Sequence, residues 1–407
     1  MRRTAKRDLT VEQQLARGPM DLPFLALVLL LLAVGLIMLL SASYASAYYN
    51  VDPDVDTGGN PYYYFLKQLK FVLGGVVLMY VVSRVNYQWL RGLSILGLLG
   101  AFLLMLLVFT PLGVAAKGTR RWLNLGFVFQ PSEVMKVAIV MFFAAKLSKR
   151  KSQLKEPKKW SKRTITGRIG GFLDKIGFLE LIPYGLILGA VLVMLYFQRH
   201  MSATILIMAT AAIVLLVGGI NLGWFFGAGA VVAGALYYII SKTEYMTARI
   251  TAWRHPEPDP LGDSFQLWQS QIAIGSGGLL GVGLGNSRQK YLFLPEEHND
   301  FIFAIVCEEL GLVGACIVMA LFALLIIRGF WLALHARDRF GTLLIVGFNT
   351  MIALQTVLNI AVVTGVLPTT GISLPFFSYG GTALVIQLGA MGVILSVSRQ
   401  IVAPKAE

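Results

Sequence analysis

Stretches of about 20 apolar residues recur along this chain, and a helix of that length crosses the hydrocarbon layer of a membrane. Ten such runs are present, at roughly 23–43, 66–84, 92–111, 131–147, 179–197, 202–219, 223–240, 301–327, 341–366 and 376–397. The gaps at 198–201 and 220–222 are short enough to keep nine or eleven helices as alternatives. Because 56% of the residues are hydrophobic and only 14% are charged, an ordinary soluble domain is excluded. The sequence predicts an all-α polytopic integral membrane protein with about ten transmembrane helices.

The basic residues indicate how the chain is threaded through the membrane. The net charge is +14, five Lys and Arg residues precede the first run, and eleven more lie in or beside the loop 148–178. Because Lys and Arg concentrate on the cytoplasmic side, both termini are expected there, as tails of residues 1–22 and 399–407 around a transmembrane domain of residues 23–398. The basic loop is typical of a segment that attracts anionic membrane lipids, and its position argues against nucleic acid as a partner.

The longest polar stretch, residues 241–300, separates the seventh and eighth predicted helices and lies on the extracytoplasmic side in this topology. Prolines at positions 256, 258 and 260 rule out a continuous helix there. The segment 264–274, SFQLWQSQIAI, is expected to form a short helix that ends at glycines. Loops of this length are usually functional, so this loop is the first place to look for a site.

Acidic residues gather around the start of the eighth predicted helix, where ionised groups are costly. Asn299 is expected to cap that helix, which would put Asp300 in its first turn at the membrane surface. The residues alone leave two interpretations of Asp300 open, a reactive carboxylate or an acid that only complements the helix dipole. Glu308 and Glu309 lie deeper and are expected to pair with a lysine or with backbone groups.

Cations on the extracytoplasmic side break the orientation rule locally. Lys136 lies inside the fourth predicted helix, and Glu133 precedes it by three residues on the same helix face. A structural ion pair and a substrate-binding role are both compatible with this spacing. Further outward positive charge comes from Arg120, Arg121, Arg288 and Lys290. Clustered cations favour an anionic substrate, and guanidinium groups suit phosphate in particular.

Irregular backbone is predicted between the last two helices, in LPTTGISLPFFSYGGTALV (367–385). At membrane depth such backbone is tolerated only where it is buried in protein or lines a cavity, so this segment is expected to border the same site. Ser378 is therefore a substrate-binding candidate, although no GxSxG turn supports it as a nucleophile. A zinc site built from the histidines is disfavoured because no HExxH or CxxC motif is present.

Several long motifs resemble one known family. In chain order they are GNPYYYFLKQ, RRWLNLG, FQPSEVMK, QSQIAIGSGGLLGVGLGNSRQKYLFLPEEHNDFIFAIVCEELGLVG and TGVLPTTGISLPFFSYGGTALV. Together they resemble the SEDS family (shape, elongation, division and sporulation) of bacterial membrane proteins, over residues 23–398. The stretch GLGNSRQKYLFLPE is more similar to the division and sporulation branch (FtsW and SpoVE) than to the elongation branch (RodA).

The resemblance implies a ten-helix peptidoglycan glycosyltransferase of the bacterial cytoplasmic membrane. Such a protein polymerises lipid II at the outer face, beside a class B penicillin-binding protein and other division-type membrane proteins. The essential aspartate of the family's (H/Q)xDFIF motif matches Asp300, and the acid and base of its QPSExxK motif match Glu133 and Lys136. Where most relatives have QPDxG, this chain has Arg199 and His200 in place of Pro and Asp, so no role for that aspartate carries over.

Glycosyl transfer from a lipid diphosphate needs a base for the attacking hydroxyl and positive charge for the departing pyrophosphate. Asp300 is the expected base, with Glu297 and Glu296 as alternatives. The expected pyrophosphate ligands are Arg121, Lys136, Arg288 and Lys290. A divalent cation, Mg²⁺ or Mn²⁺, held by Asp300 or Glu297 together with pyrophosphate oxygens, is a candidate cofactor.

Three rival functions stay open at this point. The same helices and charges would suit a transporter that moves lipid II across the bilayer, but transporters commonly contain inverted repeats, and the sequence has no convincing repeat. A scaffold that only recruits the penicillin-binding protein would make Asp300 dispensable. An elongation-type polymerase would share the chemistry and differ in its cellular role.

Overall fold

The computed structural model describes residues 18–50, 55–116, 119–124, 126, 128–149, 178–220, 227, 234, 251, 253–254 and 264–401. Nine of the ten predicted runs are helices in this part of the chain. The run 223–240, most of the basic loop 148–178 and much of the loop 241–300 lie outside the described residues. Seven of the described helices are long and apolar enough to cross a membrane. The all-α polytopic class is thus confirmed, and the total of ten stays a prediction.

The helices that follow the predicted runs are α2 (Leu22–Tyr48), α3 (Tyr63–Arg84), α4 (Trp89–Leu107), α5 (Pro131–Lys149), α7 (Phe178–Phe197), α8 (Met201–Val217), α12 (Ile302–His335), α13 (Arg339–Val363) and α14 (Gly381–Ile401). Two of these nine helices, α8 and α5, are not among the seven that are long and apolar enough to cross a membrane. Helix α8 has only 17 residues, and α5 carries Glu133, Lys136 and Lys146 within its length. A further helix, α11 (Phe265–Gly277), confirms the short helix predicted at 264–274.

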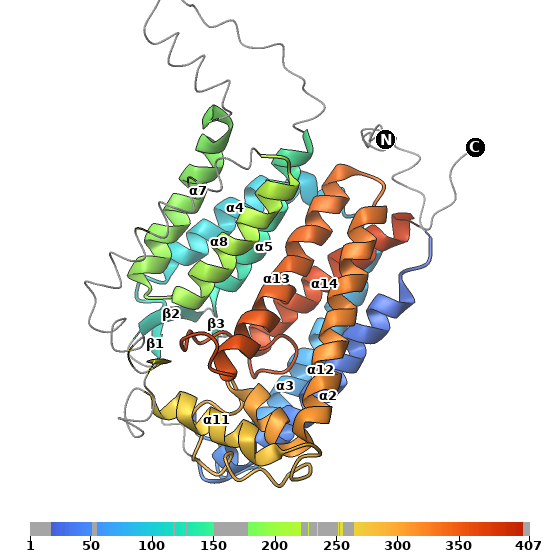
Figure 1. Cartoon of the computed structure of the whole chain (residues 1–407). Coiled ribbons are helices and arrows are strands. Elements are labelled where there is room, and N and C mark those ends of the chain that lie inside the picture. Colours follow the sequence, from blue (N-terminus) through green and yellow to red (C-terminus); the bar gives the residue numbers. More distant parts are fainter. Residues whose placement is uncertain are drawn as a thin grey trace, which may run out of the picture.

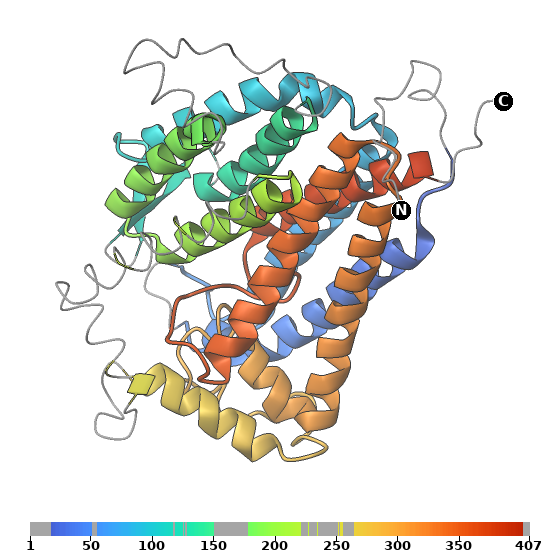
Figure 2. The same ribbon diagram turned by 45° about the horizontal axis from the view of Figure 1, so that its top comes forward.

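The bundle has two groups of helices that meet at α13. Helices α2, α3, α12 and α14 lie on one side and α4, α5, α7 and α8 on the other, while α13 packs against α12, α5 and α8 (Figures 1 and 2). In its most apolar stretch α13 has 72% of its residues buried, against 17–39% for α2, α3, α4, α7 and α12. Gly347 permits this central packing, because a Cβ there would lie 2.3 Å from Val140 of α5.

The bundle has two distinct ends. At one end the start of α2 meets the end of α14, where the Gly18 N–H donates to the Arg399 carbonyl at 2.8 Å; we call this the terminal face. Helix α11 lies across the opposite end (Figures 1 and 2), which we call the α11 face. The start of α2 and the end of α14 thus share one face, as the predicted threading requires. The assignment of this face to the cytoplasm stays a prediction from the basic residues.

A small sheet, which the sequence did not predict, lies between α4 and α5. Strands β1 (Gly113–Ala116), β2 (Thr119–Asn124) and β3 (Val128–Phe129) pair antiparallel in chain order. The register pairs Gly113 with Leu123 and Leu123 with Phe129. The strands have two to six residues, which is too short for an alternating pattern to be recognised. The sheet holds Arg120 and Arg121 beside the start of α5.

Helix α12 is interrupted at Gly311, where φ is 66° and ψ is −170°. The loop segment 278–283 satisfies the backbone groups that the break exposes. The N–H groups of Leu312 and Val313 donate to the carbonyls of Gly278 and Leu279 at 2.9 and 3.1 Å, and those of Val282 and Gly283 donate to Glu308 and Glu309 at 3.0 Å. Since an unpaired buried backbone group is costly, this pairing fixes the loop against the helix.

Gly281→Ala should destabilise the protein at this junction. Gly281 has φ of +79°, and a Cβ there would lie 2.1 Å from the Glu309 carbonyl oxygen. Gly285 is a matched control, since its φ is +82° and no atom lies within 4 Å of an added Cβ. Each substitution costs about 1–3 kcal/mol of backbone strain, and only Gly281→Ala adds the clash. Thermal unfolding in detergent should show the larger drop for Gly281→Ala, and equal drops would refute the tight junction.

Candidate active site at the α11 face

The turn before α12 differs from the predicted cap. The helix begins at Ile302 with Phe301 as its N-cap residue, and no side chain caps it. The prediction that Asn299 caps the helix is therefore wrong. Its Nδ2 instead donates to Glu296 Oε2 at 2.6 Å. Glu296 has φ of +59°, which redirects the chain into a turn, so Asp300 lies just outside the helix rather than in its first turn.

Asp300 lies against the loop between α13 and α14. Its backbone oxygen accepts a hydrogen bond from Asn359 Nδ2 of α13 at 2.7 Å, and the same amide donates to the Ile372 oxygen at 2.6 Å. Its carboxylate Oδ2 lies 3.2 Å from the position that a Cβ on Gly371 would occupy. The Asp300 side chain is partly exposed. The prediction that the broken segment 367–385 borders the Asp300 site is confirmed.

Ser378 is a structural residue of this loop cluster. Its hydroxyl accepts from the Leu374 N–H at 2.8 Å and donates to the Asn299 oxygen at 2.7 Å. Its own carbonyl accepts from Gln68 of α3 at 3.3 Å. Because the hydroxyl already donates and accepts within the protein and the side chain is buried, Ser378 holds the two loops together. Its role in binding substrate stays a prediction.

Glu297 is buried beside the end of α2 and the start of α3. Its Oε1 accepts a short hydrogen bond from Ser46 and lies 3.4 Å from His298 Nδ1. The His298 ring in turn lies on Tyr64, with centroids 4.6 Å apart, and Tyr379 packs edge-on against Tyr64 at 4.9 Å. The sequence did not predict the roles of Ser46, Tyr64 and Tyr379, because they come from three separate segments and carry no motif for such a contact.

The described residues do not supply a complete set of protein ligands for a metal ion. Within the part of the chain that the structure describes, no three His, Cys, Asp or Glu side chains come together as a ligand set. Carboxylate oxygens are the ligands that Mg²⁺ prefers, usually with substrate phosphate oxygens. Asp300 and Glu297 would therefore need oxygens of the substrate to complete a site.

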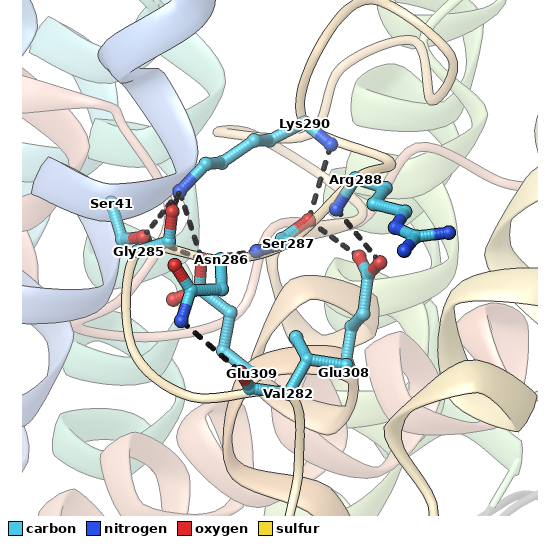
Figure 3. Close-up of polar contacts among 9 residues, drawn as sticks. All are labelled: Ser41, Val282, Gly285, Asn286, Ser287, Arg288, Lys290, Glu308 and Glu309. Atoms are coloured by element: carbon cyan, nitrogen blue, oxygen red, sulfur yellow. Dashed lines mark hydrogen bonds and ion pairs between the residues drawn. The ribbon is translucent and has the colours of Figure 1, made fainter.

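Lys290 forms the centre of a buried polar network (Figure 3). Its ammonium contacts Glu309 Oε1 at 3.0 Å, Ser41 Oγ at 3.1 Å and the Gly285 oxygen at 2.6 Å, and the residue is only 2% exposed. These contacts use its three donors and give Lys290 a structural role, and the expectation that it binds pyrophosphate stays an untested prediction. The prediction that the two glutamates pair with a lysine and with backbone groups is confirmed, since Glu308 accepts from the Arg288 N–H at 2.9 Å. The Arg288 residue itself is exposed.

A second group of polar residues lies where the sheet meets α5 and the turn between α7 and α8. Lys136 and Glu133 pair at 2.7 Å with side-chain exposures of only 3% and 11%. Arg121 of β2 donates to the backbone oxygens of Gln198 and Arg199 at 3.2 and 2.6 Å. The ion pair predicted at this spacing is thus present, and Arg121 ties the sheet to the helical turn.

His200 occupies the centre of this second group. Its Nδ1 lies 3.4 Å from Ser132 Oγ, and its Nε2 lies 3.2 Å from Gln130 Nε2. Burial, with the nearby positive charges of Arg121 and Lys136, lowers the pKa of His200 to about 3. The ring is therefore neutral near pH 7.

Lowering the pH should destabilise the fold through His200. The unfolded chain has a histidine pKa of about 6.5, whereas burial lowers it to about 3 in the folded protein. Between these values the unfolded state binds more protons, so the free energy of unfolding falls by up to about 1.4 kcal/mol per pH unit. Thermal midpoints measured from about pH 7.5 down to about 4.5 should fall more steeply for wild type than for His200→Gln. Parallel curves would contradict the burial of this histidine.

Comparison with known proteins identifies the fold and family. The family model described as a cell cycle protein, FtsW/RodA/SpoVE, matches residues 21–402. The chain belongs to this family. It is 38% identical over 381 residues to stage V sporulation protein E of Bacillus subtilis, covering 93% of this chain and 97% of the relative. It is 36% identical over 383 residues to the probable peptidoglycan glycosyltransferase FtsW of Geobacter sulfurreducens, covering 94% and 95%. The resemblance to the SEDS family and to its FtsW and SpoVE branch is confirmed.

Solved structures agree with this placement. A chain of a peptidoglycan synthase complex, described as coordinating polymerization and crosslinking, superposes with a TM-score of 0.70 at 26% identity, over 94% of this chain and 98% of that one. The rod shape determining protein RodA of Thermus thermophilus superposes with a TM-score of 0.63 at 24% identity, over 95% and 98%. The second likeness supports the fold alone.

Proposed function

We propose that this family member is a peptidoglycan glycosyltransferase that polymerises lipid II during division or sporulation. In this proposal it is a multi-pass protein of the bacterial cytoplasmic membrane, with both termini in the cytoplasm and the α11 face outside. The observation that carries the proposal is the Asp300 carboxylate, which is only partly buried and stands on a turn anchored by the 2.7 Å bond from Asn359. The names and full-length coverage of the relatives support the reaction class.

In the proposed reaction Asp300 acts as the general base. Its carboxylate takes the proton of the 4-hydroxyl of one sugar as that oxygen attacks C1 of another. The bond between C1 and the pyrophosphate oxygen breaks, and the polyprenyl pyrophosphate leaves with the electron pair. No nucleotide is consumed because the lipid diphosphate is already activated. The Asn359 amide holds the Asp300 backbone, so the carboxylate keeps one position while substrates exchange.

Positive charge at the α11 face would stabilise the departing pyrophosphate. In Figure 1 the three-stranded sheet lies toward the same end of the bundle as α11. Arg121 belongs to this sheet and Lys136 to the first two turns of α5, and both are pyrophosphate ligands in this proposal. The exposed Arg288 is a further ligand in this proposal, whereas Lys290 belongs to the network around Glu309. A Mg²⁺ or Mn²⁺ ion between Asp300 or Glu297 and the pyrophosphate would supply additional charge neutralisation.

A membrane-bound transpeptidase is the proposed partner. The chain with a TM-score of 0.70 comes from a peptidoglycan synthase complex that couples polymerization to crosslinking. By analogy with that complex, this chain is expected to act beside a class B penicillin-binding protein and other division-type membrane proteins. Such a partner would use the nascent strand at the face where it is made.

A lipid II assay in detergent separates the polymerase from its rivals. Micelles contain no second compartment, so a transporter cannot move lipid II across a membrane there and would form no glycan product. The proposal predicts that purified protein with its partner converts lipid II into glycan strands visible on a gel. A protein that yields no strands in micelles, but moves lipid II between leaflets of proteoliposomes, is a transporter instead. An elongation-type protein would be active in vitro but would support rod growth rather than division in cells.

A further inference from the structure

The loop that follows α11 presents a group of exposed apolar side chains. They belong to residues 279–284, which we call the apolar loop, and are exposed by 40–81%: Leu279, Leu280, Val282 and Leu284. No Asp, Glu, Lys or Arg occurs from residue 264 to residue 287. Because proteins surrounded by water rarely expose such a group of neighbouring apolar side chains, this surface is expected to contact an apolar partner.

The apolar loop is continuous with the outward surface of α12. The Val313 N–H donates to the Leu279 oxygen at 3.1 Å, and the Leu312 N–H donates to the Gly278 oxygen at 2.9 Å. Leu312 and Val313 are themselves 55% and 48% exposed. They belong to a helix that is long and apolar enough to cross a membrane, so the loop extends a surface that faces acyl chains.

The length of α12 gives the depth of this junction. From Leu312 to Ile327 the chain has no charged residue. As a helix this stretch is about 25 Å long, close to the hydrocarbon thickness of about 30 Å. Arg328 follows it, pairs with Asp21 at 2.5 Å and lies 4.2 Å from the Trp331 ring centroid. Arginine at a helix end and tryptophan are typical of the membrane–water boundary. The apolar loop therefore meets α12 at the opposite edge of the hydrocarbon layer.

The backbone of the apolar loop is suited to that depth, because irregular backbone next to lipid must have its polar groups paired. The Gly281 N–H donates to the Gly277 oxygen at 2.8 Å, and the Val282 oxygen accepts from Asn286 Nδ2 at 3.2 Å. The N–H groups of Val282 and Gly283 donate to α12 at 3.0 Å. The polar backbone is thus bound to the protein while the leucine side chains are exposed.

We propose that the apolar loop inserts into the lipid leaflet at the α11 face, with Leu279, Leu280 and Leu284 among the acyl chains. In the threading proposed above this is the outer leaflet. A protein partner would also cover an apolar surface, but the continuity with α12 and the depth of the junction favour lipid. The insertion requires no lipid II and does not depend on the reaction at Asp300.

Insertion would also set the height of the candidate base above the membrane. The apolar loop meets α12 at residues 308–313, whereas the helix begins at Ile302. Asp300 therefore lies up to about 15 Å further out along the helix axis. The headgroup region adds only about 5–8 Å on each side of the hydrocarbon, so the carboxylate would stand level with the sugars of a lipid-linked substrate. This consequence, unlike the insertion, rests on the proposed function.

Spin labelling of the full chain in phospholipid bilayers tests the insertion. With Cys307→Ala in place, a nitroxide is attached to the exposed Cys316 of α12. With Cys316→Ala as well, it is attached at Leu280→Cys or at Asp56→Cys, an exposed position between α2 and α3. Oxygen concentrates in hydrocarbon and a nickel chelate in water. The label at Leu280→Cys should collide mainly with oxygen, like that at Cys316, and the label at Asp56→Cys mainly with nickel.

Removing the neighbouring leucines should withdraw the apolar loop into water. With Leu279→Ser and Leu284→Ser, the nickel collision rate of the label at Leu280→Cys should rise about tenfold, because two leucines lose their apolar burial. Leu96→Ser with Leu103→Ser is the matched control, since these leucines are 67% and 58% exposed on α4. The control should leave the label at Leu280→Cys unchanged.

Two outcomes would overturn the proposal. A label at Leu280→Cys as accessible to nickel as one at Asp56→Cys would place the apolar loop in water. A label shielded from both oxygen and nickel would show that protein covers the loop, either a second copy of the chain or its own residues 241–263. Because none of these measurements uses lipid II, failure of the insertion and failure of the proposed reaction are separately visible.

Discussion

Lys290→Met is expected to destabilise the protein by about 3–5 kcal/mol, the range for removing one partner of a buried ion pair. The ammonium of Lys290 is the positive group that faces Glu309 in this network, at 3.0 Å, and the side chains are 2% and 0% exposed. Without it, the Glu309 carboxylate would stay buried with an unmatched charge. Thermal unfolding in detergent should show a large drop in midpoint, or the variant should fail to accumulate in the membrane.

A second variant separates lost charge balance from lost packing. Lys290→Met combined with Glu309→Gln removes both charges, and replacing a buried pair by neutral groups often costs little. The double variant should therefore recover most of the stability. Arg288→Met serves as the exposed control, because the Arg288 contact to Glu308 uses its backbone N–H. A midpoint for Lys290→Met no lower than that of Arg288→Met would show that the network is not structural.

Much of the fold follows from local sequence signals. Apolar runs predict helices because each helix in a membrane satisfies its own backbone, and nine of the ten runs are helices in the described residues. The short helix α11 was predictable from its flanking prolines and glycines. The sheet was not, because β3 has two residues and its pairing with β2 depends on how the chain turns between α4 and α5.

The site was predicted less completely, because its contacts join segments far apart in the chain. The Asp300 turn depends on Glu296 adopting φ of +59°, which no residue preference at that position indicates. The sequence shows the positive charge of Lys290, and that charge alone favours a pyrophosphate ligand. It does not show that segment 278–283 packs against α12, which brings Lys290 to Glu309. The pairing of Glu133 with Lys136 was predictable, since their spacing on one helix fixes it.

Asp300→Asn is expected to lower the rate of glycan polymerisation by about 10²–10⁴-fold, the usual contribution of a general base. Asparagine has nearly the same shape and cannot accept the proton. The backbone bond from Asn359 at 2.7 Å does not involve the side chain, so the turn should persist. The thermal midpoint should stay close to that of wild type, which separates a chemical defect from a folding defect.

Glu297→Gln is the matched control for the identity of the base. Its carboxylate is buried and already accepts from Ser46 and lies beside His298, so it is poorly placed to reach a sugar hydroxyl. Its loss should reduce stability more than it reduces the rate per folded molecule. A rate defect in Glu297→Gln larger than that in Asp300→Asn would move the base to Glu297.

The most direct test is the rate of glycan strand formation from purified lipid II in detergent, with the penicillin-binding partner present, for folded wild type and folded Asp300→Asn. The account predicts strands from wild type and almost none from Asp300→Asn at an unchanged thermal midpoint. Strands formed by Asp300→Asn at the wild-type rate would contradict it, because the carboxylate would then play no part in the chemistry.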